Sequence, residues 1–492
     1  MTMLKRNSPG FSYLRITIIH RQLLIMIKII VSSLFIAAIL YSCSTAPGKK
    51  DRLGKATRED KNGWIYLHAE GSPADIGYQH GYLLANDIDT SIQAVAYLLD
   101  HDTHRNWQFY RIAAKNFLWD KLDREYRDEI NGIVEGLRAQ KKDYDSLDIT
   151  AYNAMEELAY YYVPMLDDQN KPGSGNNKAP GNCSAFIATG TYTKDGRIVI
   201  GHNNWTSYMT GQHWNVIADI VPDKGHHMLM DCMPGFIHSG DDFVITDNGI
   251  LITETTITQF KGFDTTGIPE FDRARKAAQY ANSIDDVIKI FVDGNNGGYA
   301  NDWLIGDTKT NEVAKLELGL KNYRVWRSKD TAITGSNFAS DSTLIAQETT
   351  FDPHDKTTSP NGRRLRMEQL LLKDLKGKLD VETGKELEAD HFDAVQNKKA
   401  ANKCVVCGHV DEDANGCYEW DWPKYYPGGA VQSKVTTAEL AKGMQLWAHM
   451  GHPCGESFMG EKFYINHPEY AWQKKYLTNM ISYPWTLFAA KK

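Results

Sequence analysis

The pattern of apolar residues changes at Cys183, and this change limits the fold more than any other feature of the chain. Upstream, apolar residues recur at helical spacing in the stretches 107–122 and 126–140. A loop rich in Gly, Pro and Asn then covers residues 167–182. Beyond it, short runs of β-branched and aromatic residues alternate with turn signals. We therefore predict a mainly helical part up to about Met165 and a strand-rich part that begins at Cys183.

The strand-rich part shows strands and helices in separate blocks. A β-hairpin is predicted where the runs 183–193 and 197–205 flank Lys194-Asp195-Gly196. Further strands are expected in 214–222, 226–235, 243–257, 302–318 and 322–328. Helices are expected in 270–281, 283–293 and 362–378. Blocks of this kind favour an α+β layered fold over a doubly wound one.

The N-terminal segment has the pattern of an export signal. The stretch "MIKIIVSSLFIAAILYSC" has a basic residue, an apolar run, and small or apolar residues before Cys43. The apolar run, 27–41, is shorter than the ~20 residues that a membrane-spanning helix needs. Its ending, Leu40-Tyr41-Ser42-Cys43, resembles the lipobox of bacterial lipoproteins, in which the chain is cut before the cysteine and the thiol is lipidated.

These features divide the chain into four expected segments. They are a lipoprotein signal peptide (1–42), a tether (43–63), a helical N-terminal part with a cleavable linker (64–182) and a catalytic part (183–492). Lipid on Cys43 would anchor the protein in the cell envelope, facing the periplasm or the exterior. The net charge is -7, and no strongly basic stripe is present, so we expect no nucleic-acid partner.

The chain has seven cysteines, and an oxidising compartment would permit disulfides among them. The motif Cys404-Val405-Val406-Cys407 fits a redox pair, half of a zinc site or a tight disulfide. Cys417 and Cys454 could complete a four-thiolate zinc site, but no second CxxC motif occurs in the sequence. HExxH or similar spacing is also absent from the sequence. The disulfide therefore ranks above zinc, and we predict no metal site and no cofactor.

Cys183 stands at the end of the Gly/Pro/Asn-rich loop, directly before the first strand of the hairpin. A cut between Asn182 and Cys183 would give Cys183 both a thiol and a free α-amine. An α-amine has a reference pKa of about 7.7–8.0, so much of it is neutral near pH 7 and can accept a proton. Nucleophile and base would then lie on one residue. The competing interpretation is a buried structural cysteine.

Ordered blocks of sequence from Cys183 almost to the C-terminus resemble the phospholipase B-like family of N-terminal-nucleophile hydrolases. The blocks are "NCSAF", "HNNWTSY", "PGFIHSGDDF", Glu254-Thr255-Thr256, "YANDW", "GSNF" and "GGAVQSKVTT". One position departs from the family pattern, because Ala300 replaces the first residue of an Asn-Asn pair and leaves Asn301. In the helical part, "GSPADIGYQHG" is similar to related bacterial acyltransferases of the penicillin-forming type.

The resemblance implies a four-layer αββα fold that matures by self-cleavage between Asn182 and Cys183. The two fragments, 43–182 and 183–492, would stay associated. It also implies that Cys404 and Cys407 form a family disulfide. The activity implied is hydrolysis of acyl esters or amides, with deacylation of lipids as the first choice of substrate and no cofactor.

Several polar side chains are candidates for the catalytic site beside Cys183. Asn301 is the first candidate for binding the oxyanion, because an amide donor carries no charge to desolvate. Asn204 or Asn337 is the second candidate for that role. His202 lies on the strand predicted to pair with the Cys183 strand. It could orient the amine or the acyl group, or it could be a core histidine.

Candidates for substrate binding are weaker. Trp205 is expected to form a wall of the pocket. Asp242, in the Asp241-Asp242 pair, could belong to an acid/base site, but turn and hydrogen-bonding roles are the alternative. Arg364 could lie near the substrate or on a solvated helix face. Glu254 is expected to be structural.

The predicted function is therefore that of a self-cleaved cysteine hydrolase with a small acyl compound as its partner. One alternative is an N-acyl amide or peptide hydrolase, or an acyltransferase, of the same fold. The other is a lipoprotein that only binds lipid or glycan, which would need neither Cys183 nor a cleavable loop.

Overall fold

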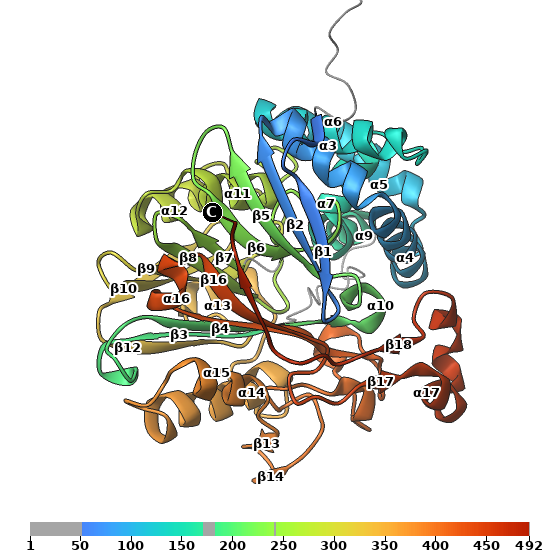
Figure 1. Cartoon of the computed structure of the whole chain (residues 1–492). Helices are drawn as coiled ribbons and strands as arrows, with labels where there is room; N and C mark the ends of the chain where they lie inside the picture. The colour runs from blue at the N-terminus through green and yellow to red at the C-terminus, as the bar shows by residue number, and fades with distance from the viewer. Residues whose placement is uncertain (1–51, 171–182, 241–242, 492) are drawn as a thin grey trace, which may run out of the picture. The chain divides into compact units, whose positions relative to one another are not determined.

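The structure is a computed structural model, and it describes residues 52–170, 183–240 and 243–491. The predicted signal peptide, Cys43, Asn182 and Asp242 lie outside these residues. By its internal contacts the chain separates into residues 1–54 and residues 55–492, and the following description concerns the second unit. It is a mixed α+β structure (Figure 1).

Two large sheets dominate the described residues. Sheet A has nine strands: β1 (Thr57–Lys61), β2 (Trp64–Gly71), β5 (Val216–Pro222), β6 (Met228–Cys232), β7 (Val244–Thr246), β8 (Ile250–Thr256), β9 (Asn301–Asp307), β10 (Glu312–Leu318) and β11 (Tyr323–Ser328). Sheet B has six strands, in the order β12 (Thr331–Gly335), β3 (Cys183–Thr189), β4 (Val199–Ser207), β15 (Gly428–Thr437), β16 (Gln445–Met450) and β19 (Thr486–Ala489). The hairpin β3–β4 and all the strands expected from the sequence are present.

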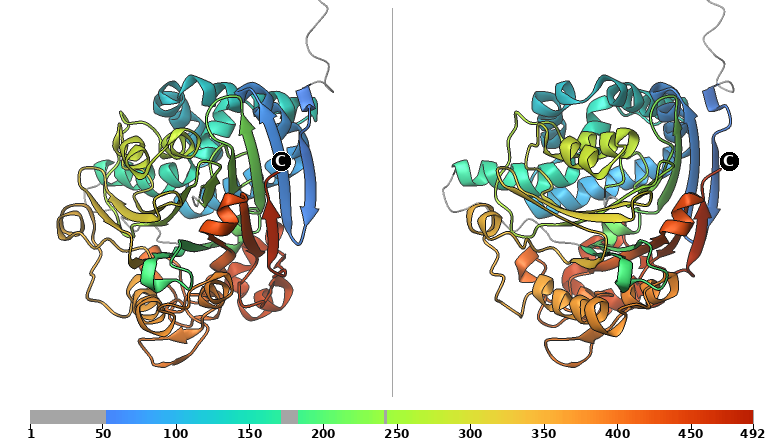
Figure 2. Two further views of the ribbon diagram at one scale, coloured as in Figure 1. Left: turned by 60° about the vertical axis from the view of Figure 1, so that its left-hand side comes forward. Right: turned by 90° about the vertical axis from the view of Figure 1, so that its left-hand side faces the viewer.

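Helices surround the two sheets (Figures 1 and 2). The longer ones before Cys183 are α3 (Pro73–Leu83), α4 (Ala85–Thr103), α5 (Trp107–Ala113), α6 (Arg124–Ala139), α7 (Ser146–Asn153) and α9 (Val163–Asn170). Those after it are α11 (Glu270–Tyr280), α12 (Ile284–Val292), α13 (Ser342–Glu348), α14 (Ser359–Gln369), α15 (Val381–Glu388) and α17 (Gly460–Asn466). The shorter elements that matter below are the π-helical turn η3 (Leu158–Tyr162) and the 3-10 turns η6 (Val410–Glu412) and η7 (Tyr418–Trp420).

Three apolar cores explain how these elements pack. One lies between sheet A and sheet B, and it takes Ala185 and Ile187 from β3. A second lies between sheet A and the helices α3–α7, α11 and α12. A third lies where Phe186 and Ala188 of β3 meet α14 and α15. Alternate residues of one strand therefore enter different cores, which fixes which side chains face the other sheet.

Helices α3 and α6 touch backbone to backbone. Each carries a pair of glycines four residues apart, Gly77 and Gly81 in α3 and Gly132 and Gly136 in α6. A Cβ atom on Gly136 would lie 2.5 Å from both the Tyr78 carbonyl oxygen and the Tyr82 nitrogen. No larger residue fits there unless the helices separate, because the obstructing atoms belong to the backbone.

The start of the ordered chain differs from the sequence prediction. Residues 57–61, assigned to the tether, form β1, and residues 64–71, assigned to the helical part, form β2 in parallel register with β5. The physical reason is that β2 is buried on both faces: Ile65 and Leu67 enter the helix-side core, and Trp64 and Tyr66 enter the core between the sheets. Such a strand is a continuous apolar run, which periodicity cannot distinguish from helix.

The implied disulfide between Cys404 and Cys407 is wrong. Within the described residues, no cysteine forms a disulfide. The two thiols have different neighbours: Cys404 Sγ lies 4.0 Å from the Thr358 carbonyl oxygen, and Cys407 Sγ lies 3.4 Å from His409 Nε2. Burial also raises the pKa of Cys404 to about 12.

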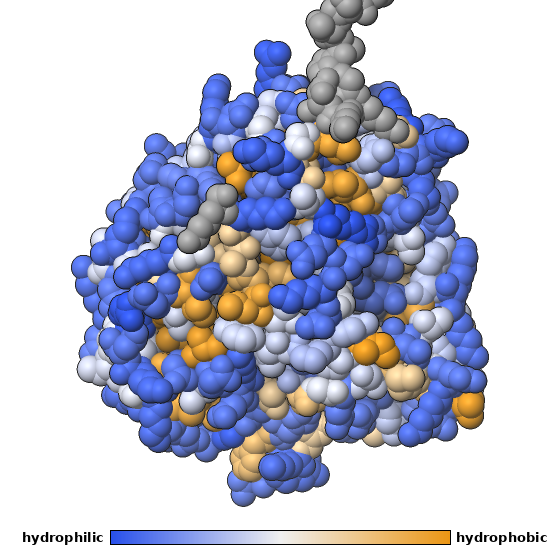
Figure 3. All heavy atoms as spheres, viewed as in Figure 1, coloured by the Kyte–Doolittle hydropathy of each residue, from blue (hydrophilic) through white to orange (hydrophobic). Residues whose placement is uncertain are grey.

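Within the described segments, every helix is too short or too polar to span a bilayer. On the face seen in Figure 1, apolar side chains occur in separate patches among hydrophilic ones (Figure 3).

Candidate active site

Cys183 is the first residue of β3, and its side chain is buried (2% exposed). Its backbone nitrogen donates a hydrogen bond of 3.0 Å to Oδ1 of Asn337. Asn337 follows β12 and adopts a left-handed backbone (φ 69°), which asparagine tolerates better than most residues. Its Nδ2 donates to the Thr256 carbonyl oxygen at 3.0 Å, at the end of β8. Asn337 therefore connects the Cys183 strand of sheet B to sheet A.

A histidine and a carboxylate lie beside the Cys183 thiol. Cys183 Sγ, one ring nitrogen of His202 and one carboxylate oxygen of Glu254 all lie within 4.8 Å of one another. The Sγ–Oε1 distance between Cys183 and Glu254 is 3.9 Å. Tyr299 donates to the same Glu254 oxygen at 3.1 Å. Burial, together with the charge of Lys434, holds the pKa of His202 well below its usual range, so its imidazole is neutral and is a weaker base than an exposed histidine.

Arg363, in α14, holds the first residues of β3. Its guanidinium donates to the carbonyl oxygen of Cys183, to Ser184 Oγ at 3.0 Å and to Asn337 Oδ1 at 2.7 Å. It also lies 4.4 Å from the centre of the Trp205 ring. Burial lowers the pKa of Arg363 to about 10, which leaves it charged at neutral pH. This one side chain therefore contacts the backbone of Cys183, the side chain of Asn337 and the Trp205 ring.

Arg364, for which the sequence left open a place near the substrate or on a solvated helix face, lies on the partly exposed side of α14. Its guanidinium stands 4.6 Å from the Phe338 ring and 4.0 Å from Glu368, one turn further along the helix. Its side chain is 27% exposed, whereas Arg363 is fully buried. Successive residues of a helix point about 100° apart, so only one of the two neighbours can face the site.

Two asparagine amides at the site are well suited to bind an oxyanion. Asn301 is the first residue of β9 and pairs with Thr256, which accepts the Asn337 hydrogen bond. Both polar atoms of its side chain are buried without a hydrogen-bond partner in the described structure. Asn204 lies directly opposite Cys183 in the β3–β4 ladder, and its Nδ2 is likewise buried without one. Unsatisfied buried amides are uncommon in folded proteins and indicate a ligand or functional role.

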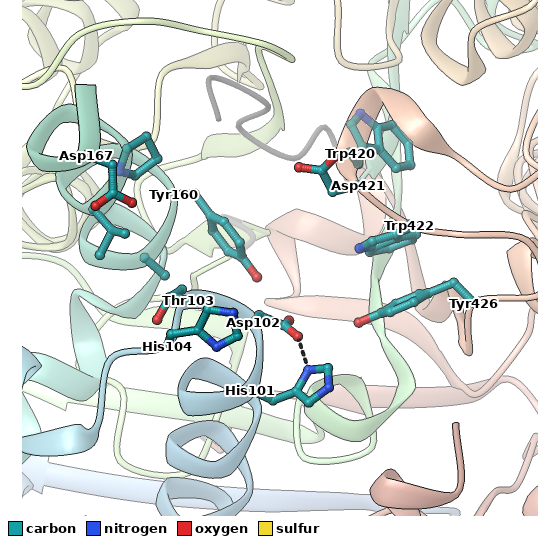
Figure 4. Close-up of a pocket in the computed structure, with 13 residues that line it drawn as sticks. His101, Asp102, Thr103, His104, Tyr160, Asp167, Trp420, Asp421, Trp422 and Tyr426 are labelled. Atoms are coloured by element: carbon teal, nitrogen blue, oxygen red, sulfur yellow. Dashed lines mark hydrogen bonds and ion pairs between the residues drawn. The ribbon is translucent and has the colours of Figure 1, made fainter. Parts of the chain in front are cut away.

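A cavity of about 640 Å³ lies on the other side of Trp420, and Cys183, His202 and Asn337 are not among the residues that line it (Figure 4). It is lined by the end of α4, by η3 and α9, and by residues 420–426. Aromatic rings form much of its wall: Tyr160, Trp420, Trp422 and Tyr426. Trp420 connects the cavity to neighbours of the Cys183 cluster, since its ring lies 6.2 Å from that of Trp205 and its Nε1 donates to Thr258 at 2.9 Å. The Thr258 nitrogen in turn donates to the Asn337 carbonyl oxygen.

The structure thus brings together most of the residues singled out from the sequence: Cys183, His202, Asn204, Trp205 and Asn337. Asn301 lies on β9, next to the strand β8 that carries Glu254. Sequence reasoning missed Arg363, Tyr299 and Trp420, and it assigned Glu254 only a structural role. Glu254 and Tyr299 stood within or beside quoted sequence blocks, so a signal was available. Trp420 carried no such signal.

Comparison with known proteins shows the family of the chain. The model of the phospholipase B family matches residues 79–352, which is more than half of the chain. The chain belongs to the phospholipase B family. The matched region includes Cys183, His202, Glu254, Asn301 and Asn337.

Individual phospholipase B relatives are distant. An uncharacterised protein of Archaeoglobus fulgidus is 26% identical over 281 residues, which cover 54% of this chain and 45% of that protein. A rat protein named "Putative phospholipase B-like 2" is 24% identical over 371 residues, 65% of this chain and 59% of its own length. Phospholipase B-like protein G of Dictyostelium discoideum is 40% identical over 138 residues, 26% of this chain and 23% of its own. The chain thus spans about half the length of the first two of these relatives.

Proposed function

We propose that this protein is a cysteine N-terminal-nucleophile hydrolase that matures by cutting itself between Asn182 and Cys183 and then cleaves acyl ester or amide bonds. The single observation that carries the proposal is the position of Cys183. It begins a central strand, its nitrogen is held by Asn337, and its thiol lies beside His202 and Glu254. The order of helices, sheet, sheet and helices around the three cores supports the four-layer αββα fold of that superfamily.

The self-cleavage step needs a base other than the amine. Before the cut, the Cys183 nitrogen belongs to a peptide bond and cannot accept a proton. The neutral imidazole of His202 can take the thiol proton instead, and the thiolate then attacks the carbonyl carbon of Asn182. The peptide C–N bond breaks, the proton passes to the departing nitrogen, and a thioester remains. Water hydrolyses this thioester, which leaves a carboxylate on residue 182 and a free amine on Cys183.

In the matured protein the α-amine of Cys183 becomes the nearest base to the thiol. Asn337 Oδ1, which accepts from this nitrogen, would hold its lone pair in a fixed direction. The thiolate attacks the substrate carbonyl, the leaving group takes the proton, and water releases the acid from the acyl-enzyme. Asn301 and Asn204 are the donors available to the oxyanion, because their amide groups are already buried and fixed.

Lipid deacylation is the substrate class that the cavity and the family favour. The aromatic walls formed by Tyr160, Trp420, Trp422 and Tyr426 suit an acyl chain. Charged and polar groups at the same cavity, including His101 and Asp102 with a hydrogen bond of 2.7 Å between them, suit a polar head group. The relatives named phospholipase B-like support the same class. N-acyl amides are the second candidate, because the same acyl-enzyme chemistry serves both bonds.

We also propose that the mature chain begins at a lipidated Cys43 and is held in the cell envelope. Replacing Cys43 by Ser should release the protein from the membrane fraction or leave its signal uncut. An unchanged membrane fraction together with an uncleaved wild-type N-terminus would contradict this part of the proposal.

Intact mass and activity test the catalytic proposal together. Wild-type protein should give two co-purifying fragments, ending at 182 and starting at 183, and Cys183→Ala should remain one inactive chain. Cys183→Ser should cut slowly, because a hydroxyl is far less ionised than a thiol near neutral pH. A panel of matched fluorogenic acyl esters and amides then defines the bond that is cleaved. Full activity of Cys183→Ala on any of them would refute the mechanism.

A further inference from the structure

A second cluster of reactive side chains lies outside the site described above. Three loops bring it together: the segment after α15, the loop before η6, and the loop after β16. One ligand atom from each of four side chains lies within 4.8 Å of all the others. We propose that these side chains bind one zinc ion in a closed, structural site: His391, Cys407, His409 and Cys454.

The distances fit ligands arranged around a shared centre. His391 Nε2 lies 3.0 Å from His409 Nε2, and the same His409 atom lies 3.4 Å from Cys407 Sγ and 3.7 Å from Cys454 Sγ. In a tetrahedral site with Zn–N of about 2.0–2.1 Å and Zn–S of about 2.3 Å, two nitrogens are about 3.3 Å apart and a nitrogen and a sulfur about 3.6 Å. One ring nitrogen cannot make three good hydrogen bonds, so a central cation accounts for the convergence better than pairwise bonds do.

The orientation of His391 gives an independent argument. Its Nδ1 lies 2.8 Å from the Ala389 carbonyl oxygen, which can only accept a hydrogen bond, so Nδ1 carries a proton. In the neutral ring, Nε2 then presents its lone pair toward His409. Metal-binding histidines are commonly held in this way, with the second ring nitrogen donating to a carbonyl.

The ligand types select the metal and the role. Two sulfurs and two imidazole nitrogens in a tetrahedron favour zinc over calcium or magnesium, which prefer oxygen. Four protein ligands leave no open position for water or substrate, so the site is structural rather than catalytic. Cys407 and His409 are buried, while His391 and Cys454 are only partly so, which leaves a path for the ion.

Zinc at this place would support the position of Trp205, a neighbour of the candidate active site. Gly408 lies between two of the ligands in a left-handed conformation (φ 61°), and a Cβ atom there would collide with the Trp205 ring. Trp205 in turn lies against the Arg363 guanidinium. The ion would fix the loop that presses on this tryptophan. All four ligands follow residue 352, where the match to the family model ends, so the site is inferred from this chain's own geometry.

Metal content and cobalt substitution test the proposal. Purified full-length protein should contain one zinc ion per chain by mass spectrometry of the metal, and chelation should lower its melting temperature until zinc is restored. Cys454→Ser should lose the zinc. Cys404→Ser is the matched control, because Cys404 is a buried neighbour outside the cluster, and it should keep the metal. Cobalt(II) bound to the wild type should show the intense visible absorption of tetrahedral thiolate coordination.

A second variant tests the site even if Cys454→Ser fails to fold. His391→Cys should still bind one metal ion, and its cobalt spectrum should shift toward stronger sulfur-to-metal absorption, since three thiolates replace two. The proposal is overturned if native wild-type protein, incubated with excess zinc without unfolding, binds none, or if Cys454→Ser keeps a full equivalent. It is also overturned if Cys407 and Cys454 are found joined in a disulfide in metal-free, active protein.

Discussion

Replacing Arg363 by Met is the sharpest test of the candidate site, because the adjacent Arg364 provides a matched control on the same helix. Met preserves much of the apolar contact but removes every donor. Five oxygens then lose the guanidinium. Three belong to Cys183 and its neighbours: the carbonyl oxygen of Cys183, Oγ of Ser184 and Oδ1 of Asn337. The other two are Oγ of Ser359 and, at 3.4 Å, the carbonyl oxygen of Ser336. A buried acceptor left without its donor costs about 1–3 kcal/mol. We take the lower limit for the first three, since Asn337 Oδ1 keeps its bond from the Cys183 nitrogen, and count nothing for the last two, since the Ser359 hydroxyl can rotate and the Ser336 contact is long.

The cation–π contact with Trp205 is also lost, which adds up to about 2 kcal/mol in a desolvated setting. We therefore expect Arg363→Met to lower the free energy of unfolding by about 3–5 kcal/mol. Arg364→Met should lower it by less than about 1 kcal/mol, because its partly exposed pair with Glu368 contributes little.

Urea unfolding in the Cys183→Ala background measures both values without interference from chain cutting. In protein that keeps Cys183, the rate at which the chain is cut into two fragments should fall in Arg363→Met and stay near wild type in Arg364→Met. Equal unfolding midpoints for the two variants would refute the reasoning, and so would unchanged cutting by Arg363→Met.

Three further predictions follow from the fold and the site. In a melting assay, Gly136→Ala should destabilise the protein by about 1–3 kcal/mol or more, since the new methyl group meets backbone atoms. Gly443→Ala is the control and should be nearly neutral, because no atom lies closer than 3.4 Å to the new Cβ. Asn301→Ala should lower turnover about 10²–10³-fold and leave cutting largely intact, and a collapsed melting curve would show Asn301 to be structural instead. Burial raises the pKa of Asp272 from 3.8 to about 7, so the folded state favours the protonated carboxyl group. The stability that Asp272 contributes is therefore fully present below pH 4 and is lost as the pH rises to 7, on the order of 4 kcal/mol in total. Asp272→Asn can still accept the hydrogen bond from the Asp123 nitrogen. In this variant the free energy of unfolding should depend less on pH between pH 4 and 7, and an unchanged pH dependence would contradict the raised pKa of Asp272.

Local pattern predicted much of the fold. The β3–β4 hairpin was accessible because Lys194-Asp195-Gly196 marks its turn and each strand carries its own pattern. The strand β2 was not, because burial on both faces removes the alternation that distinguishes a strand from a helix. Its partner β5 lies about 150 residues further along the chain, and nothing local to either segment indicates that they pair.

The site shows the same division between local and distant information. Cys183, His202 and Asn204 lie on one hairpin, so register alone places them together. Arg363 reaches the site from α14, and the sequence singled out only its neighbour Arg364, without deciding between a site position and a solvated one. Which of two adjacent helical residues faces inward depends on the surface against which the helix packs, and that surface is distant in sequence. The four ligands of the proposed zinc site come from three loops, and their spacing follows no recognised motif, which is why only the assembled structure reveals them.

The parallel pairing of β2 with β5 has a consequence for the life of the mature protein. Strand β2 lies upstream of the proposed cut and β5 downstream, and they pair from Ile65↔Val216 to Gly71↔Pro222. The precursor can form this ladder as a first-order, intramolecular event. Once the chain is cut, the same ladder joins two separate polypeptides, and recovery from unfolding becomes a second-order reaction that depends on concentration. The cut that is proposed to create the activity would thus also remove the ability to refold when dilute. The lifetime of the cut protein would then be set by its rate of unfolding rather than by its equilibrium stability.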